Sequence, residues 1–151
     1  MIINPGEISL KDSLQICQAS IKKARELDFM PITVTVVDVG GVIRATLSEN
    51  GSGLLRADIA YAKAWSCIVT GWSTTTIRNI LEEQPRLDKA AASMQILSDG
   101  KLLPTPGGLL IQNDYKNIGA VGISGDRSDE DEICAIAGIE AAGFVAGHRA
   151  I

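Results

Sequence analysis

Residues 118–147 have the sequence IGAVGISGDRSDEDEICAIAGIEAAGFVAG. This stretch predicts a glycine-rich strand, a tight loop and a helix that begins at an N-cap, Ser128, and continues to about Gly147. Ser128 and Asp131 have the Ser-x-x-Asp spacing of a capping start, and residues 129–132 are all acidic, which the positive end of the helix dipole favours. Glycine inside a strand marks a bulge or the close approach of a ligand or another backbone.

A nucleotide-binding interpretation of this stretch is not favoured. The glycine spacing is Gly-x-x-Gly-x-x-Gly, which differs from the dinucleotide fingerprint, and no Walker Lys-Ser/Thr ending follows. The four carboxylates stand where a phosphate would lie at the helix start, and they would repel it. We therefore expect a close-packed strand here and no phosphate loop.

Length and composition narrow the class of protein. A chain of 151 residues fits one domain, spanning residues 1–151. A formal charge of −4 and a pI near 4.9 argue against nucleic acid or an anionic membrane as the main partner. Three widely spaced cysteines without a Cys-x-x-Cys pair suit inert thiols and a cytoplasmic location. The sequence predicts no signal peptide, no metal site and no apolar run of the roughly 20 residues that a membrane span needs.

The rest of the chain alternates helical and strand patterns. In chain order we predict a helix over 9–27 with a capping start at Ser9 and Asp12, a hairpin of strands over 32–38 and 42–47 joined by a Gly-Gly turn, and a helix over 54–70. A shorter helix from 73 to 81, capped within residues 73–76, is followed by a second hairpin, in which residues 113–117 join a strand over 109–112 to the glycine strand. Residues 86–101 fit either a helical turn or a loop. This order predicts an α+β domain with one central antiparallel sheet and helices packed on it.

Several motifs together resemble the GlcG/HbpS family, which includes the carboxy-terminal domain of PduO-type proteins. The motifs occur in the family's order and are Val37-Asp38-Val39-Gly40-Gly41, Ala60-x-x-Lys63-Ala64, Pro106-Gly107-Gly108, the glycine strand 119–125, Asp131 and Ala137-Gly138. The resemblance implies a profilin-like α+β fold, haem or small-molecule binding in some members, and homo-oligomers that are often octamers.

The sequence also departs from the family pattern. The family's Arg-Met-Asp-Gly stretch corresponds here to residues 48–51, Ser-Glu-Asn-Gly, and Pro106-Gly107-Gly108 is followed by two leucines. The single histidine, His148, lies outside every family motif, so we do not expect it to hold haem. The cofactor therefore stays unknown, although the resemblance makes haem a candidate.

Lys63 is the sharpest candidate site residue. Its neighbours on a helix are mostly small or apolar, so it does not lie on an evidently solvated face. A partly buried lysine has a lowered pKa and can bind an anion or act as a base, whereas the alternative is a lysine whose stem passes alanines to reach water. The family motif favours the first interpretation.

The other candidate residues would surround Lys63. Backbone N–H groups at bare glycines would bind an anionic or oxygen-rich ligand, and a loop carboxylate and amide would lie at the rim. The proposed ligand-binding residues are Asn50, Lys63, Gly107, Gly108, Gly119, Ser124 and Asp131, and the proposed catalytic residues are Lys63 and Glu49. A solvated role for Glu49 and Asn50, and a purely helix-capping role for Asp131, are the competing interpretations.

A stripe of aromatic and aliphatic residues lies on another face of the helix over 54–70 and just beyond it. The chain is poor in aromatics, so we interpret Tyr61, Trp65, Ile68 and Trp72 as anchors of a subunit interface. This stripe and the small-residue helix over 133–147 predict a homo-oligomer.

Two functions remain from the sequence. The first is an oligomeric protein that binds a small oxygenated metabolite or haem. The second is an enzyme that moves protons on a small oxygenated metabolite, as an isomerase, lyase or hydrolase, with Lys63 in the site. Haem uptake would favour the first, and turnover lost in Lys63→Ala would favour the second.

Overall fold

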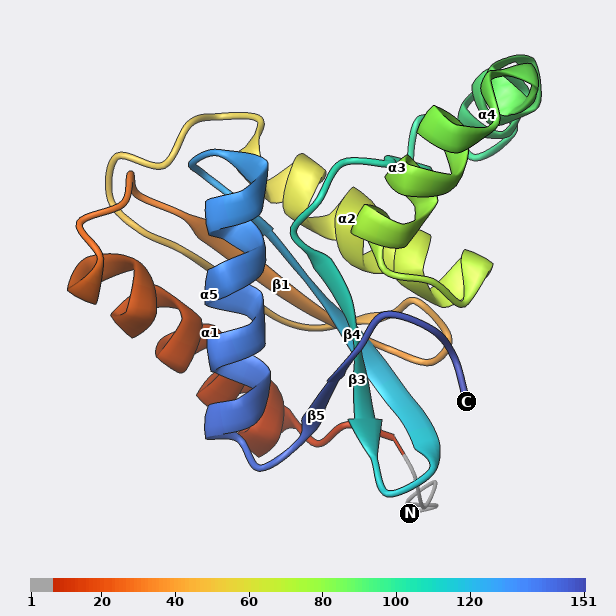
Figure 1. Cartoon of the computed structure of the whole chain (residues 1–151). Coiled ribbons are helices and arrows are strands. Elements are labelled where there is room, and N and C mark those ends of the chain that lie inside the picture. The colour runs from red at the N-terminus through yellow and green to blue at the C-terminus, as the bar shows by residue number, and fades with distance from the viewer. Residues whose placement is uncertain (1–6) are drawn as a thin grey trace.

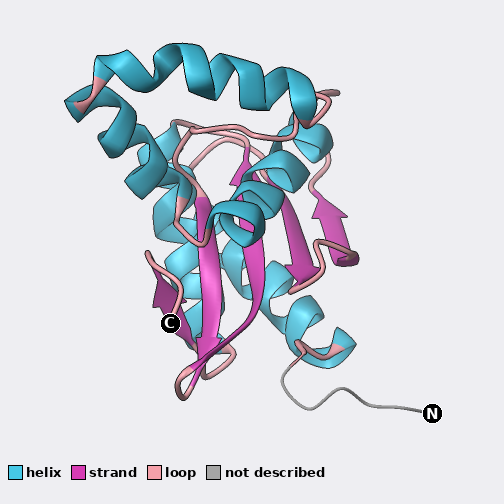
Figure 2. Cartoon of the chain, turned by 90° about the vertical axis from the view of Figure 1, so that its right-hand side faces the viewer, coloured by secondary structure: helices cyan, strands magenta, loops and turns pink. Residues whose placement is uncertain are grey.

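A computed structural model describes residues 7–151 and places one antiparallel sheet between two helical layers (Figures 1 and 2). The elements are α1 (Leu10–Glu26), β1 (Thr33–Asp38), β2 (Ile43–Ser48), α2 (Arg56–Thr70), α3 (Thr74–Glu83), a 3-10 turn (Pro85–Leu87), α4 (Asp88–Leu97), β3 (Gly108–Asn113), β4 (Lys116–Ser124), α5 (Ser128–Ala141) and β5 (Val145–Gly147). The predicted α+β class with a central antiparallel sheet is confirmed.

The sheet order is β2-β1-β4-β3-β5, and every neighbouring pair is antiparallel. The two predicted hairpins, β1–β2 and β3–β4, pair with each other through β1 and β4. All six residues of β1 are buried because helices cover both faces of the sheet. In Figure 1, α1 and α5 lie on one side of the sheet, and α2, α3 and α4 lie on the other.

Two apolar cores result. The larger lies under α1 and α5 and includes Ile16, Val34 and Ile139, while the smaller lies under α2 and includes Val37, Cys67 and Leu110. Helix α2 sits so close to the sheet that a Cβ on Gly122 of β4 would overlap the carbonyl oxygen of Ala60. The glycine strand is therefore bare because another backbone approaches it, which agrees with the close-packed interpretation.

Capping predictions at two helices are confirmed. The Ser9 hydroxyl accepts from the N–H of Asp12 at 3.0 Å, and the Ser73 hydroxyl accepts from the N–H of Thr76 at 3.2 Å. Residues 86–101, for which the sequence predicted either a helical turn or a loop, contain α4. None of the residues of α4 is buried, so this helix stands away from the body of the molecule at the upper right of Figure 1.

The prediction for the C-terminal helix is wrong at both ends. Ser128 is the first residue of α5, and Arg127 is the cap, with no side-chain capping bond. The helix ends at Ala141 because Gly143 takes a left-handed conformation, with φ of 84°, in the turn that follows. The chain then forms β5, whose residue Ala146 pairs with Ile111 of β3.

The small residues of α5 also have an internal role. A Cβ on Gly138 would overlap the Ser20 hydroxyl of α1, so these two helices pack in direct contact. The sequence predicted that the small residues of this helix contact another subunit, but at Gly138 the helix contacts α1 of the same chain. None of the helices in the described part of the chain is long and apolar enough to cross a membrane.

Candidate functional site

Lys63 lies near the middle of α2 on the face that packs on the sheet, and its side chain is only 2% exposed. Its ammonium donates to the backbone oxygen of Ile123 at 2.7 Å and to Oδ2 of Asp131 at 2.9 Å. Asp131 is equally buried, at 1% exposed, and belongs to the first turn of α5. The interpretation of Lys63 as a lysine that reaches water is therefore wrong.

The two charges form a closed pair. The second carboxylate oxygen of Asp131 accepts from the N–H of Asp126 at 3.2 Å, so both of its oxygens are bonded. Burial lowers the pKa of the Lys63 ammonium and raises the pKa of the Asp131 carboxyl, while the attraction between the two charges opposes both shifts. The pair is thus internally neutralised.

The Pro-Gly-Gly loop closes over this pair. A Cβ on Gly107 would stand 2.9 Å from the Lys63 ammonium and 2.9 Å from the Cβ of Asp131, and its φ of 112° also favours glycine. A Cβ on Gly108 would stand 2.7 Å from the backbone oxygen of Lys63. The N–H of Gly108 donates to the hydroxyl of Thr74 at 2.9 Å. These glycines make room for the lysine and for α2, and the Gly108 N–H is already used.

The structure brings only some of the predicted residues together. Lys63, Asp131, Gly107 and Gly108 are neighbours, and Ser124 lies one residue beyond Ile123, where its hydroxyl accepts from Arg56 at 3.2 Å. Gly119 is four residues back along β4 from Ile123, about 13 Å away at the rise of a strand. It packs against Val37, and so it stands apart from the lysine.

The predicted loop residues also lie apart from Lys63. Oε1 of Glu49 pairs with Arg25 at 2.9 Å, and Oε2 accepts from the N–H of Ile32 at 2.8 Å. Asn50, the next residue, is exposed. Glu49 therefore ties the β2–α2 loop to the start of β1 and to α1.

Sequence reasoning missed three groups at this site: the backbone oxygen of Ile123, the hydroxyl of Thr74 and the guanidinium of Arg56. Arg56 precedes Lys63 by seven residues on the same helix face, so helical spacing alone was a usable signal for it. The other two contacts join elements that are distant in the sequence, and no local pattern announces them.

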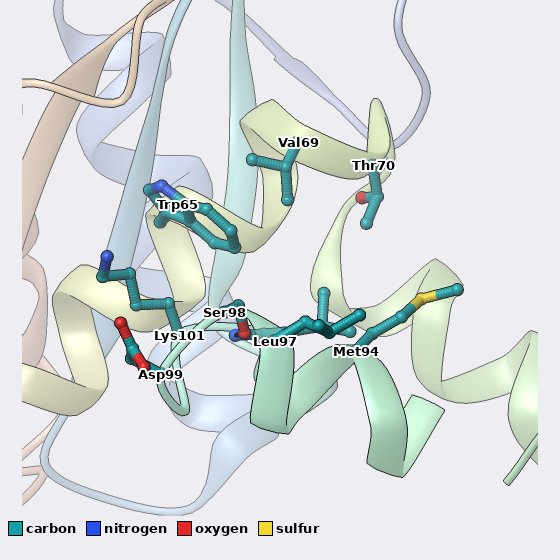
Figure 3. A pocket seen from close by; sticks show the side chains of 9 residues that line it. Trp65, Val69, Thr70, Met94, Leu97, Ser98, Asp99 and Lys101 are labelled. Atoms are coloured by element: carbon teal, nitrogen blue, oxygen red, sulfur yellow. Dashed lines mark hydrogen bonds between the residues drawn. The ribbon is translucent and has the colours of Figure 1, made fainter. Parts of the chain in front are cut away.

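A separate hollow of about 410 Å³ lies on the outer side of α2 (Figure 3). Trp65 and Val69 of α2 form one wall, and Met94 and Leu97 of α4 form the other. Lys101, in the segment after α4, holds its ammonium 5.7 Å from the centre of the Trp65 ring. The hollow is thus mainly apolar, with one cation against its aromatic wall.

The predicted aromatic stripe divides in the structure. Tyr61 and Ile68 pack against the smaller core, and Trp65 lines the hollow. Trp72 lies beyond the end of α2 and borders a second apolar hollow of about 150 Å³ between α3 and α4. The His148 side chain is held in place by a hydrogen bond, because its Nδ1 lies 2.9 Å from the Ser73 hydroxyl.

The fold and this buried site define a class of small α+β proteins with a central antiparallel sheet, a glycine-rich strand beneath one helix and a lysine under a Pro-Gly-Gly loop. The family model described as haem degrading protein HbpS-like matches residues 8–140, and the chain belongs to this HbpS-like family. The predicted family is therefore confirmed.

Individual proteins agree with this assignment. The chain is 26% identical over 127 residues to the corrinoid adenosyltransferase PduO of Salmonella typhimurium, which covers 84% of this chain but only 36% of that protein's length. Among solved structures it is similar to the PduOC–haem complex, with a TM-score of 0.82, 25% identity and coverage of 93% of this chain and 99% of that one. It is also similar in fold to the ORFY protein of Klebsiella pneumoniae, with a TM-score of 0.81, 24% identity and coverage of 95% and 98%.

Proposed function

We propose that this protein is a single-domain homo-oligomer that binds a small molecule. The observation that supports this most is the fold agreement with PduOC in its haem complex across 93% of the chain, together with membership of the HbpS-like family. The three cysteines are free and buried, which fits our further proposal of a cytoplasmic location. The expected ligand is anionic or rich in oxygen.

Haem is the first ligand to test because of these relatives, but the large hollow offers few conventional iron ligands among the described residues. Haem iron is usually held by histidine, thiolate, methionine or tyrosine. The single histidine, His148, does not line the large hollow, and burial raises the pKa of the Cys17 and Cys67 thiols to about 12, so neither is a thiolate at neutral pH. Among residues 7–151, Met94 is the one side chain of these types that lines the large hollow. The residues therefore favour a ligand other than coordinated haem.

The test is a titration with haemin beside a thermal-shift screen of small carboxylates and other oxygenated metabolites. A ligand present at 100 times its dissociation constant raises the free energy of unfolding by about 2.7 kcal/mol. We expect at least one small carboxylate to stabilise the protein. If neither haemin nor any metabolite binds, the proposed function is wrong.

The haemin arm includes the variant His148→Ala. If haemin does produce a Soret band, that band should be unchanged in the variant, because His148 is half-exposed and does not line the large hollow. A band that disappears in His148→Ala would show that the histidine binds the iron and would contradict our expectation.

One observation favours a second candidate function, proton transfer at Lys63. Its ammonium has three N–H bonds, and two acceptors, Ile123 and Asp131, are present among the described residues. Burial lowers the pKa of the Lys63 ammonium and raises the pKa of the Asp131 carboxyl, and both shifts favour the neutral forms that a proton transfer would use. An enolisable metabolite that turns over with wild type, but not with Lys63→Arg, would support this candidate.

A further inference from the structure

Three features of the residues that line the large hollow in Figure 3 suit a small ligand. The indole of Trp65 forms an aromatic wall, Leu97 and Met94 line the hollow from α4, and the Lys101 ammonium lies over the indole, 5.7 Å from its centre. Leu97 is 85% exposed and Met94 is 53% exposed. When a flat apolar molecule covers apolar side chains as exposed as these, the free energy falls, and this favours binding.

The position of Lys101 is fixed by its backbone. Its carbonyl oxygen accepts from the hydroxyl of Ser66 at 3.1 Å, and the same hydroxyl accepts from the N–H of Leu103 at 2.8 Å. Ser66 is fully buried on α2 beside Trp65. The segment carrying the cation is thus anchored through its backbone to the helix that carries the aromatic wall, so the Lys101 side chain starts from a fixed place beside Trp65.

We propose that this hollow binds a planar aromatic carboxylate, with its ring between Trp65 and Leu97 and its carboxylate paired with Lys101. A volume of about 410 Å³ lies in the usual range for small-ligand sites. Stacking on the indole selects a flat ring, and the ammonium selects a negative group at the ring's edge. This inference rests on the proposed small-molecule function and assigns its ligand class to the hollow, away from the Lys63–Asp131 pair.

One group opposes the anion. Asp99 also lines the hollow and lies near Lys101 in Figure 3, and no ion pair joins the two side chains among the described residues. A carboxylate placed on Lys101 would feel repulsion from Asp99, so Asp99→Asn should strengthen its binding. A cationic ring would show the opposite response. The effect of Asp99→Asn on affinity therefore shows whether the bound ligand is an anion or a cation.

The test uses three probes with one ring system: 2-naphthoate, 2-naphthalenemethanol and 2-naphthylmethylammonium. The parent protein carries Trp72→Phe, so that fluorescence reports Trp65 alone of the two tryptophans. We expect 2-naphthoate to quench Trp65 and to bind more tightly than the alcohol or the ammonium. Lys101→Met should weaken 2-naphthoate about threefold, as expected for an exposed ion pair, and leave the neutral alcohol unchanged.

Calorimetry on the wall variants completes the test. Leu97→Ala should weaken all three probes, and it leaves the fold intact because the side chain is mostly exposed. Trp65→Ala should weaken 2-naphthoate by about tenfold, while Trp65→Phe retains most of the binding because the ring remains. Circular dichroism confirms that each variant is folded.

Two results would overturn this inference. One is 2-naphthoate binding that is unaffected by Trp65→Ala, Leu97→Ala and Lys101→Met. The other is no probe binding, with Leu97→Glu converting an oligomer into monomers, which would make the hollow a subunit interface. If metabolites or haemin still bind in either case, the proposed function survives and only the site assignment fails.

Discussion

The ammonium of Lys63 lies 2.9 Å from the carboxylate of Asp131, so an ion pair links α2 and α5, two helices that pack on opposite faces of the sheet (Figure 1). Both side chains are almost completely buried. The pair costs desolvation energy to form, but the loss of one member leaves a buried charge without a partner. Substitutions in this ion pair should therefore change the free energy of unfolding.

We predict that Lys63→Met destabilises the protein by about 3–5 kcal/mol, the usual cost of an unpaired buried charge. The double variant Lys63→Met/Asp131→Asn should be more stable than this single variant, because it removes the orphaned carboxylate. Urea unfolding measures both. Lys22→Met is the matched control: its side chain is 78% exposed, and the change should stay within about 0.5 kcal/mol. An unchanged stability in Lys63→Met would show that the buried pair does not exist.

Gly122 provides a test of the contact between α2 and the sheet. Gly122→Ala should destabilise the protein by about 1–3 kcal/mol or more, because the new methyl group would overlap the backbone of Ala60. Gly53→Ala is the control, since its methyl group would meet the Arg56 side chain at an ordinary 3.5 Å. Thermal unfolding of the two variants should differ clearly. Equal melting temperatures would mean that α2 lies too far from β4 for a methyl group on residue 122 to overlap the Ala60 backbone.

The buried thiols predict a pH dependence of stability. Burial raises the pKa of Cys17 and of Cys67 from 9.0 to about 12, so the folded protein keeps these protons where the unfolded chain loses them. This contribution to stability is fully present below pH 9 and is lost as the pH rises from 9 towards 12. Unfolding free energies measured from pH 7 to 11 should therefore fall less steeply in Cys17→Ala than in wild type. Identical slopes would contradict the prediction.

The homo-oligomer proposal is testable on α4. Ile96 is 80% exposed and does not line the large hollow, so it offers a partner a contact that leaves the hollow open. Light scattering should give a multiple of 16.0 kDa for the wild type, and Ile96→Glu should reduce that mass. Lys89→Glu, also exposed on α4, serves as the charge control and should leave the mass unchanged. A wild-type mass of 16.0 kDa would refute the oligomer itself.

The sequence by itself determined the α+β class, both hairpins, the caps at Ser9 and Ser73, and the family. These features depend on local rules: β-branched runs favour strands, Gly-Gly favours a turn, and a hydroxyl three residues before an N–H caps a helix. The neighbours of Lys63 along α2 also indicated a residue away from solvent, and it is buried.

Only the tertiary structure decided what Lys63 meets. Asp131 is 68 residues away in the chain, and the sheet order brings it next to the lysine. The same holds for β5, where the local pattern favoured a continued helix, while the free edge of β3 offered Val145–Gly147 a better set of backbone partners. Local sequence specifies which conformations a segment prefers. Which side chains become neighbours depends on how the segments pack, because burial and long-range pairing outweigh local preference.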